Sequence, residues 1–140
     1  MLGIVANPAS GKDVRRLVAR ASVFDNQEKQ AIVRRALIGA ATAGNLDVAY
    51  LNDAHGIVRN AISDTGLDAQ ALDTTRTTTA LDTITAARAM REQRCRAVIT
   101  LGGDGTNRAF CLGWQDAPLV PISTGTNNVF PVLAEATVAG

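Results

Sequence analysis

The stretch Ala97–Asn107 reads AVITLGGDGTN, and it decides the fold. Its first part, Ala97 to Leu101, is apolar and β-branched, which is typical of a strand buried on both faces of a parallel sheet. A glycine-rich turn begins at Gly102, and a helix through Ala109 to Leu112 is expected to follow. Because strand, glycine turn and helix follow each other directly, the sequence favours an α/β fold built from βαβ units.

The same alternation extends over the rest of the chain. Four further strands are expected, at Leu2–Ala6, Asp47–Leu51, Ala69–Leu72 and Leu119–Ile122. Helical spacing of apolar residues predicts further helices from Asp13 onward, over Gln27–Thr42, after Asp53, over the segment that bears Leu81 to Met90, and from Pro131 onward. We therefore expect an α/β domain of three layers, with a parallel sheet of about five strands and helices on both faces.

Two of these helices carry specific expectations. Asp53 is expected to cap the helix that bears Ile57, Ala61 and Ile62. In the next helix, one buried face is expected to consist of Leu81, Ile84, Ala87 and Met90. The polar, threonine-rich segment Asp73–Thr79 before that helix is expected to form a loop and a helix cap.

Composition and charge exclude several classes of protein. The chain has 140 residues, of which 46% are hydrophobic and 19% charged, and 14 basic residues face 13 acidic ones. This balance argues against disorder and gives no overall attraction to nucleic acid or acidic membranes. Cys95 and Cys111 match no metal or redox spacing, so we expect ordinary buried thiols. No apolar run approaches the roughly 18 residues of a membrane span, and we expect a cytoplasmic protein.

The chain is expected to be one domain, residues 1–140, taken from a longer protein. Its length fits one folding unit. Helical spacing continues through Val132, Leu133, Ala136 and Ala139 up to the last residue without a stop signal. We therefore expect a fragment that ends inside or just after a helix.

Three polar loops follow predicted strands. Asn7–Lys12, NPASGK, offers backbone amides and the Lys12 ammonium to a phosphate, although it lacks the residues of a Walker P-loop. Ser123–Asn128, STGTNN, offers hydroxyls and carboxamides that suit ribose, base or phosphate. Each of these two loops can also be read as a simple turn or cap. Since strand ends of a parallel sheet share one edge, however, the loops are expected to meet there and form a nucleotide site.

The glycine-rich loop after the fourth strand carries the most specific chemistry. The glycines of Gly102–Thr106 allow backbone amides to approach pyrophosphate oxygens. Asp104 repels phosphates unless it holds Mg²⁺ or accepts a proton from an attacking hydroxyl, and both roles belong to phosphoryl transfer. A glycine turn capped by Asp104 is the alternative. The dinucleotide fingerprint GxGxxG is not met, because Arg108 stands at its last glycine.

The order of the motifs NPASGK, LGGDGT and PISTGTNN resembles that of the ATP–NAD kinase and diacylglycerol kinase superfamily. Within it, GGDGTNR and STGTNNVFP are most similar to the NAD-kinase-like proteins associated with acetoin catabolism. GGDGT is the specific motif, and the resemblance covers essentially the whole chain. It implies a domain like the amino-terminal domain of NAD kinase and phosphofructokinase, with a carboxyl-terminal β-rich domain beyond this sequence.

Carried over by position, the resemblance implies ATP as phosphate donor, Mg²⁺, and NAD as substrate. It implies Asp104 as the catalytic residue, which activates the acceptor hydroxyl or organises Mg²⁺. The implied nucleotide-binding residues are Asn7, Lys12, Gly102, Gly103, Gly105, Thr106, Gly125, Thr126 and Asn127. One departure stands out, since NAD kinases usually carry Asn-Glu and lipid kinases Asn-Asp where this chain has Asn127-Asn128.

Three further residues are interpreted as follows. His55 has no catalytic or metal-binding partner at a recognised spacing and is expected at the surface or in a cap. Trp114 has no aromatic neighbours that would indicate a stacking platform, so it is assigned to packing. Arg76 is either solvent-exposed or close to the phosphate-binding edge of the sheet.

The leading hypothesis is an ATP-dependent kinase that phosphorylates a hydroxyl of NAD or a related small molecule. A non-catalytic, regulatory nucleotide-binding module is the first alternative, because Asn128 lacks the carboxylate of the active families. A lipid kinase of the diacylglycerol kinase type is the second, although no membrane-facing patch is evident. The expected partner is a nucleotide rather than a nucleic acid, and assembly into a homo-oligomer stays open.

Overall fold

The computed structural model describes residues 1–11, 25–44, 46–63, 65–124 and 128–131. Its centre is a five-stranded sheet in which every pair of neighbouring strands is parallel. The strands are β1 (Leu2–Ala6), β2 (Val48–Tyr50), β3 (Ala69–Ala71), β4 (Ala97–Gly102) and β5 (Leu119–Ser123). All five lie where the sequence predicts them, and the α/β fold class is confirmed.

The strand order is β3-β2-β1-β4-β5, so the chain first builds the sheet outward from β1 and then returns to its other side. Strand β1 consequently lies between β2 and β4, with Leu2 paired to Val48 on one side and to Ala97 on the other. In open parallel sheets, ligands bind outside the carboxyl ends of the strands at the point where the order reverses. Here that point lies between the ends of β1 and β4.

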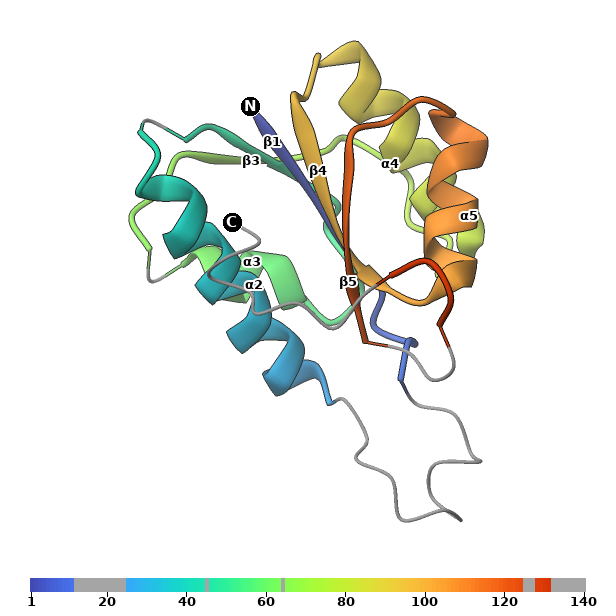
Figure 1. Cartoon of the computed structure of the whole chain (residues 1–140), viewed down its shortest axis with the longest axis horizontal. Helices are drawn as coiled ribbons and strands as arrows, with labels where there is room; N and C mark the ends of the chain where they lie inside the picture. Colours follow the sequence, from blue (N-terminus) through green and yellow to red (C-terminus); the bar gives the residue numbers. More distant parts are fainter. Residues whose placement is uncertain (12–24, 45, 64, 125–127, 132–140) are drawn as a thin grey trace.

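Four described helices complete the layers: α2 (Asn26–Ala41), α3 (Ile57–Ile62), α4 (Ala80–Glu92) and α5 (Asp104–Gly113). Helices α2 and α3 cover one face of the sheet, while α4 and α5 cover the other (Figure 1). Alternate residues of β1 serve the two cores, since Ile4 packs toward α2 and Val5 toward α4. The predicted three-layer arrangement is therefore confirmed.

Some helix predictions need correction. Asp53 does not cap α3, because the cap position is Gly56, whose left-handed φ of 64° separates the Asp53 turn from the helix. The buried face of α4 does not include Leu81, which is 51% exposed. Leu81 lies nine residues before Met90, about two and a half turns, and thus on the opposite side of the helix. Thr83 and Ala86 are buried with Ala87 and Met90 instead.

Other helix predictions are confirmed, or they fall on residues outside the described ranges. Helix α2 matches its expected span, and its first turn is capped by Asp25, whose side chain accepts the Glu28 N–H. The threonine-rich loop ends in Thr79, which caps α4 as expected. Helix α5 begins at Asp104, inside the motif that the sequence indicated as a turn. The helices expected from Asp13 and from Pro131 fall on residues 12–24 and 132–140, which lie outside the described residues.

The two cysteines are free and differ in their surroundings. Cys95 is buried, and this burial raises the pKa of its thiol, whereas Cys111 is half-buried. Because the thiolate is the reactive form, iodoacetamide at pH 8 should alkylate Cys111 faster than Cys95. Peptide mass spectrometry over time measures both rates, with the urea-unfolded chain as the control in which they converge. Equal rates in the folded protein would contradict this account.

Candidate functional site

A cleft of about 990 Å³ opens at the carboxyl edge of the sheet, over the ends of β1 and β4. Loops that follow four strands converge on it, and Asn128 reaches it from beyond β5. The lining residues are 6–11, Leu51, 53–55, 78–80, Asp82, Thr83, 103–106, Ala109 and Asn128. The cleft therefore lies at the position that the strand order predicts for a ligand site.

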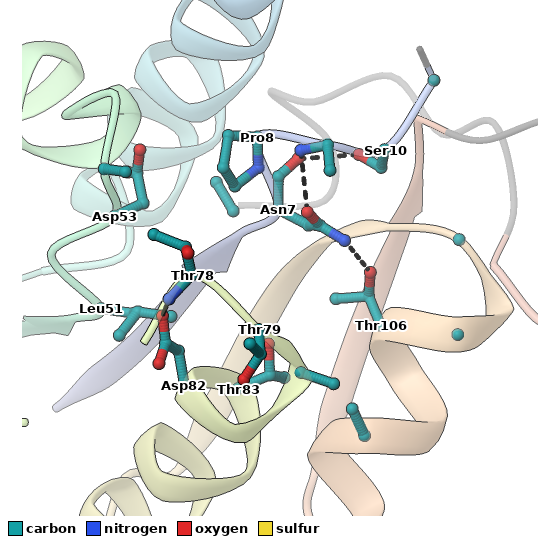
Figure 2. Close-up of a pocket in the computed structure, with 18 of the residues that line it drawn as sticks. Asn7, Pro8, Ser10, Leu51, Asp53, Thr78, Thr79, Asp82, Thr83 and Thr106 are labelled. Atoms are coloured by element: carbon teal, nitrogen blue, oxygen red, sulfur yellow. Dashed lines mark hydrogen bonds between the residues drawn. The ribbon is translucent and has the colours of Figure 1, made fainter. Parts of the chain in front are cut away.

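Asn7 ties the loop after β1 to the start of α5. Its side-chain amide donates to Oγ1 of Thr106 at 2.8 Å, and its Oδ1 accepts the Ala9 N–H at 2.9 Å. Figure 2 shows the Asn7 side chain directed at Thr106 across the cleft floor. On the other side of the loop, the Ser10 hydroxyl lies 2.7 Å from that of Thr124 after β5. One short loop thus connects three strand ends.

Lys29, in α2, holds the loop after β1 by hydrogen bonds to its backbone. It lies in the first turn of α2 and is fully buried. Its ammonium donates to the backbone carbonyls of Asn7, Pro8 and Ser10 at 2.9, 3.0 and 2.7 Å. A buried ammonium requires such partners, because its desolvation is otherwise very costly. These bonds fix the carbonyls of the NPAS turn toward α2, on the side away from the cleft.

The GGDGT motif forms the end of β4 and the first turn of α5. Gly103 is the N-cap, and the backbone N–H groups of this first turn lie at the cleft. A Cβ on Gly102 would lie 2.4 Å from Oγ1 of Thr106, so glycine is required there for packing. A Cβ on Gly105 would meet nothing within 4 Å. Packing therefore does not require a glycine at position 105, and the missing side chain leaves room beside the first turn of α5.

Asn107 supports this turn from inside the protein. It is 3% exposed, its Nδ2 donates to the carbonyl of Gly103 at 3.0 Å, and its Oδ1 accepts the Thr100 hydroxyl at 2.6 Å. The Gly103 carbonyl also accepts the backbone N–H groups of Thr106 and Asn107, so it faces into the first turn of α5. The amides of Gly103 and Gly105 lie at the N-terminal end of this helix. A helix N-terminus with its partial positive charge is suited to a phosphate group.

The carboxylate of Asp104 is held at the rim of the cleft. It accepts the backbone N–H of Val129 at 3.0 Å and that of Phe130 at 3.0 Å. Asn128 completes this connection, because its Oδ1 accepts the Asp104 N–H at 3.4 Å while its Nδ2 donates to the Ser123 hydroxyl at 2.6 Å. Asp104 thus joins the start of α5 to the segment after β5.

The opposite wall of the cleft comes from the loops after β2 and β3. Figure 2 shows Asp53 there, with Thr78, Thr79, Asp82 and Thr83 below it. The carboxylate of Asp82 has a structural role, since it accepts the backbone N–H groups of Thr77 and Thr78 at 2.7 and 2.8 Å. These bonds fix the threonine loop at the start of α4, with Thr78 in a left-handed conformation at φ 60°.

The charge of the cleft is unusual for a phosphate site. Its ionisable lining side chains within the described residues are three aspartates, Asp53, Asp82 and Asp104, together with His55. No group of three or more metal-binding side chains occurs in the described part of the chain. A phosphate here would meet the backbone amides at the start of α5, and Asp104 offers a carboxylate oxygen, a type of ligand that Mg²⁺ accepts.

The predicted site residues are distributed as follows. The structure brings Asn7, Gly103, Asp104, Gly105 and Thr106 together in the cleft, and Gly102 lies directly behind them in β4. Four other predicted binding residues lie outside the described residues, namely Lys12, Gly125, Thr126 and Asn127.

The remaining sequence interpretations can also be placed. Arg76 is exposed and does not line the cleft, which agrees with its solvent-exposed alternative. His55 is exposed at the rim, as expected. Trp114 is 9% exposed and lies 6.4 Å from the Phe110 ring, so it belongs to the core.

Sequence reasoning missed two residues of the site. Lys29 continues the buried face of α2, three, four and seven residues before Ile32, Val33 and Ala36. That periodicity was a signal that the lysine is buried. Asp53 was assigned to a cap, and its place in the cleft wall follows only from the three-dimensional structure.

Fold and site together define a class of protein, a parallel α/β domain with a ligand cleft at the reversal of its strand order. The chain belongs to the ATP-NAD kinase N-terminal domain family, whose sequence model matches residues 2–140. It is also similar to the acetoin catabolism protein X of Cupriavidus necator, with 37% identity over 149 aligned positions. That alignment covers 100% of this chain and 42% of the relative, so the chain spans less than half of that protein. None of the helices in the described ranges has the length and apolar character to cross a membrane.

Proposed function

We propose that residues 1–140 are the nucleotide-binding domain of an ATP-dependent kinase, which phosphorylates a hydroxyl of NAD or a related small molecule. The observation that carries this proposal is the meeting of Asn7, the open end of α5 and the Asp104 carboxylate in one cleft. Membership of the ATP-NAD kinase N-terminal domain family supports it. A second, β-rich domain would complete the cleft.

The residues of the cleft divide the work of phosphoryl transfer. Asn7 and Lys29 hold the loop after β1, and the amides at Gly103 and Gly105 bind phosphate oxygens of ATP. Asp104 accepts the proton of the attacking hydroxyl or holds Mg²⁺, and the amides of Val129 and Phe130 fix its carboxylate in place. Mg²⁺, when bound, neutralises charge that develops on the transferred phosphoryl group.

Two free thiols and the use of ATP and NAD fit a reducing, nucleotide-rich compartment, so we place the protein in the cytoplasm.

A non-catalytic nucleotide-binding module is the second candidate. It is favoured by Asn128, a neutral residue that contacts the Asp104 backbone where the active families place a carboxylate. Saturable binding of ATP and NAD without any phosphorylated product from the intact protein would support this module over the kinase.

Isothermal titration calorimetry of the intact protein with ATP and Mg²⁺, and separately with NAD, tests the nucleotide site itself. We expect saturable binding of both ligands. Absence of binding by either ligand at millimolar concentration would contradict the kinase and the binding module alike.

Gly105→Ala separates ligand binding from folding at this site. Because the added Cβ meets nothing within 4 Å and alanine favours helices over glycine by up to about 1 kcal/mol, the free energy of unfolding should stay equal or rise. Binding of ATP with Mg²⁺ should weaken about tenfold, since the methyl group stands between the helix amides and a phosphate. Urea denaturation measures the free energy of unfolding, and calorimetry measures the affinity for ATP.

Arg108→Ala, on the exposed face of the same helix, is the matched control and should change neither quantity. Unchanged ATP affinity in Gly105→Ala would remove the α5 amides from the phosphate site.

A further inference from the structure

Asp53 is a buried carboxylate with one oxygen left without a partner. The residue follows β2, is 7% exposed and lines the cleft. Its Oδ1 accepts the backbone N–H of His55 at 2.8 Å. Its Oδ2 is buried and has no hydrogen-bond donor in the described part of the protein.

Such an oxygen is unusual, because nearly all buried polar groups in proteins have hydrogen-bond partners. Leaving a buried acceptor without a donor costs roughly 1 to 3 kcal/mol, and more when the group is charged. Asp53 takes no part in the cap of α3, which begins with Gly56. Oδ1 serves the turn before α3 through the His55 N–H, and the fold gives no structural reason for the second oxygen of this carboxylate.

The position of Asp53 shows what kind of group it faces. The phosphate-binding features, Asn7 and the start of α5, lie on one side of the cleft, while Asp53 lies on the other (Figure 2). The same wall carries the hydroxyl-bearing Thr78, Thr79 and Thr83, together with Leu51 and the Asp82 carboxylate. This wall offers acceptors and hydroxyl groups without any positive charge from lysine or arginine in the described residues.

We propose that Asp53 is a binding residue that determines specificity by accepting a hydrogen bond from a sugar hydroxyl of the substrate. The inference rests on the proposed function and deepens it, because it assigns the wall formed by the β2 and β3 loops to a ribose or a similar polyol. The terminal torsion of an aspartate is soft, so the carboxylate can turn toward a ligand in the cleft without a change in the backbone. The hydroxyl then supplies the donor that the protein does not.

The test compares the intact wild-type protein with Asp53→Asn, which keeps the shape of the side chain and an oxygen for the His55 N–H. The probes for calorimetry are NAD, two NAD analogues that each lack the hydroxyls of one ribose, and inorganic pyrophosphate. Asp73→Asn, an exposed aspartate outside the cleft lining, is the matched control. Thermal unfolding of each variant is measured in parallel.

We expect Asp53→Asn to weaken NAD binding tenfold or more and to leave pyrophosphate binding within twofold. One of the two deoxygenated analogues should bind the wild type more weakly than NAD does. This analogue should have the same affinity for Asp53→Asn as for the wild type. The melting temperature of Asp53→Asn should be equal to or above that of the wild type, because an amide is less costly to bury than a lone carboxylate oxygen. A structural role would lower it instead.

Three results would overturn the inference while leaving the proposed function standing. The first is unchanged NAD affinity in Asp53→Asn, and the second is an equal loss of affinity for NAD and for pyrophosphate. The third is a difference in affinity between the variant and the wild type that persists with both analogues. If neither NAD nor pyrophosphate binds the wild type, the proposed function fails and this inference fails with it.

Discussion

Asp104→Asn should lower kcat of the intact protein by a factor of 100 or more, while the affinities for ATP and NAD change by no more than a few-fold. The physical reason is that the amide cannot accept a proton from the attacking hydroxyl and is a poor ligand for Mg²⁺. Positioned acid–base groups contribute about 10² to 10⁴ to a rate. The loss falls on the transition state, where charge moves, so it appears in kcat more than in binding. A product-resolved kinase assay together with calorimetry measures both quantities.

Asp104 also has a structural role that the experiment must separate, since its carboxylate accepts the amides of Val129 and Phe130. The melting temperature of Asp104→Asn therefore needs to be measured beside its turnover. Asp116→Asn, an exposed aspartate outside the cleft lining, is the control and should leave both unchanged. Unaltered turnover in folded Asp104→Asn would remove this residue from the chemistry.

Lys29→Met should destabilise the protein by about 2 kcal/mol or more and lower its melting temperature by roughly 5 to 10 °C. Methionine fills a similar volume, but it removes the ammonium that the carbonyls of Pro8 and Ser10 bond, while the Asn7 carbonyl keeps the Ser10 N–H and hydroxyl as donors. Each buried carbonyl without a donor costs about 1 kcal/mol or more. Binding of ATP should weaken as well, because these bonds fix the loop that Asn7 connects to α5. Urea denaturation and calorimetry measure the two effects.

Gln27→Met is the matched control, because Gln27 is exposed on the first turn of the same helix. It should leave both the free energy of unfolding and the ATP affinity unchanged. A loss below 1 kcal/mol in Lys29→Met would show that the loop after β1 holds its conformation without the lysine.

The fold could be predicted because its determinants are local. Ala97–Leu101 is apolar apart from Thr100 and ends at glycines, and a similar short apolar run, Leu2–Ala6, ends at Asn7-Pro8. Such runs mark buried parallel strands, and their alternation with helices restricts the topology to a few arrangements. The meeting of Asn7 with Gly103 and Asp104 then followed, because the loops after parallel strands share one edge of the sheet.

The parts of the site that could not be predicted depend on contacts between distant residues. The ammonium of Lys29 bonds carbonyls 19 to 22 residues away, and a sequence shows where a backbone carbonyl points only after the loop is folded. The same holds for Asp53, whose unpartnered oxygen depends on which donors the neighbouring loops bring near it. The bonds from Val129 and Phe130 to Asp104 join positions 25 and 26 residues apart, and no local pattern encodes them.

The most direct test of the central claim is a product-resolved kinase assay on the intact protein. ATP and Mg²⁺ are supplied, and NAD, NADH and a diacylglycerol are offered in parallel reactions. We expect NAD to be phosphorylated to NADP by the wild type, and the product to fall at least 100-fold in Asp104→Asn. No phosphorylated product from any acceptor, with ATP and NAD binding retained, would contradict the kinase and leave a nucleotide-binding module in its place.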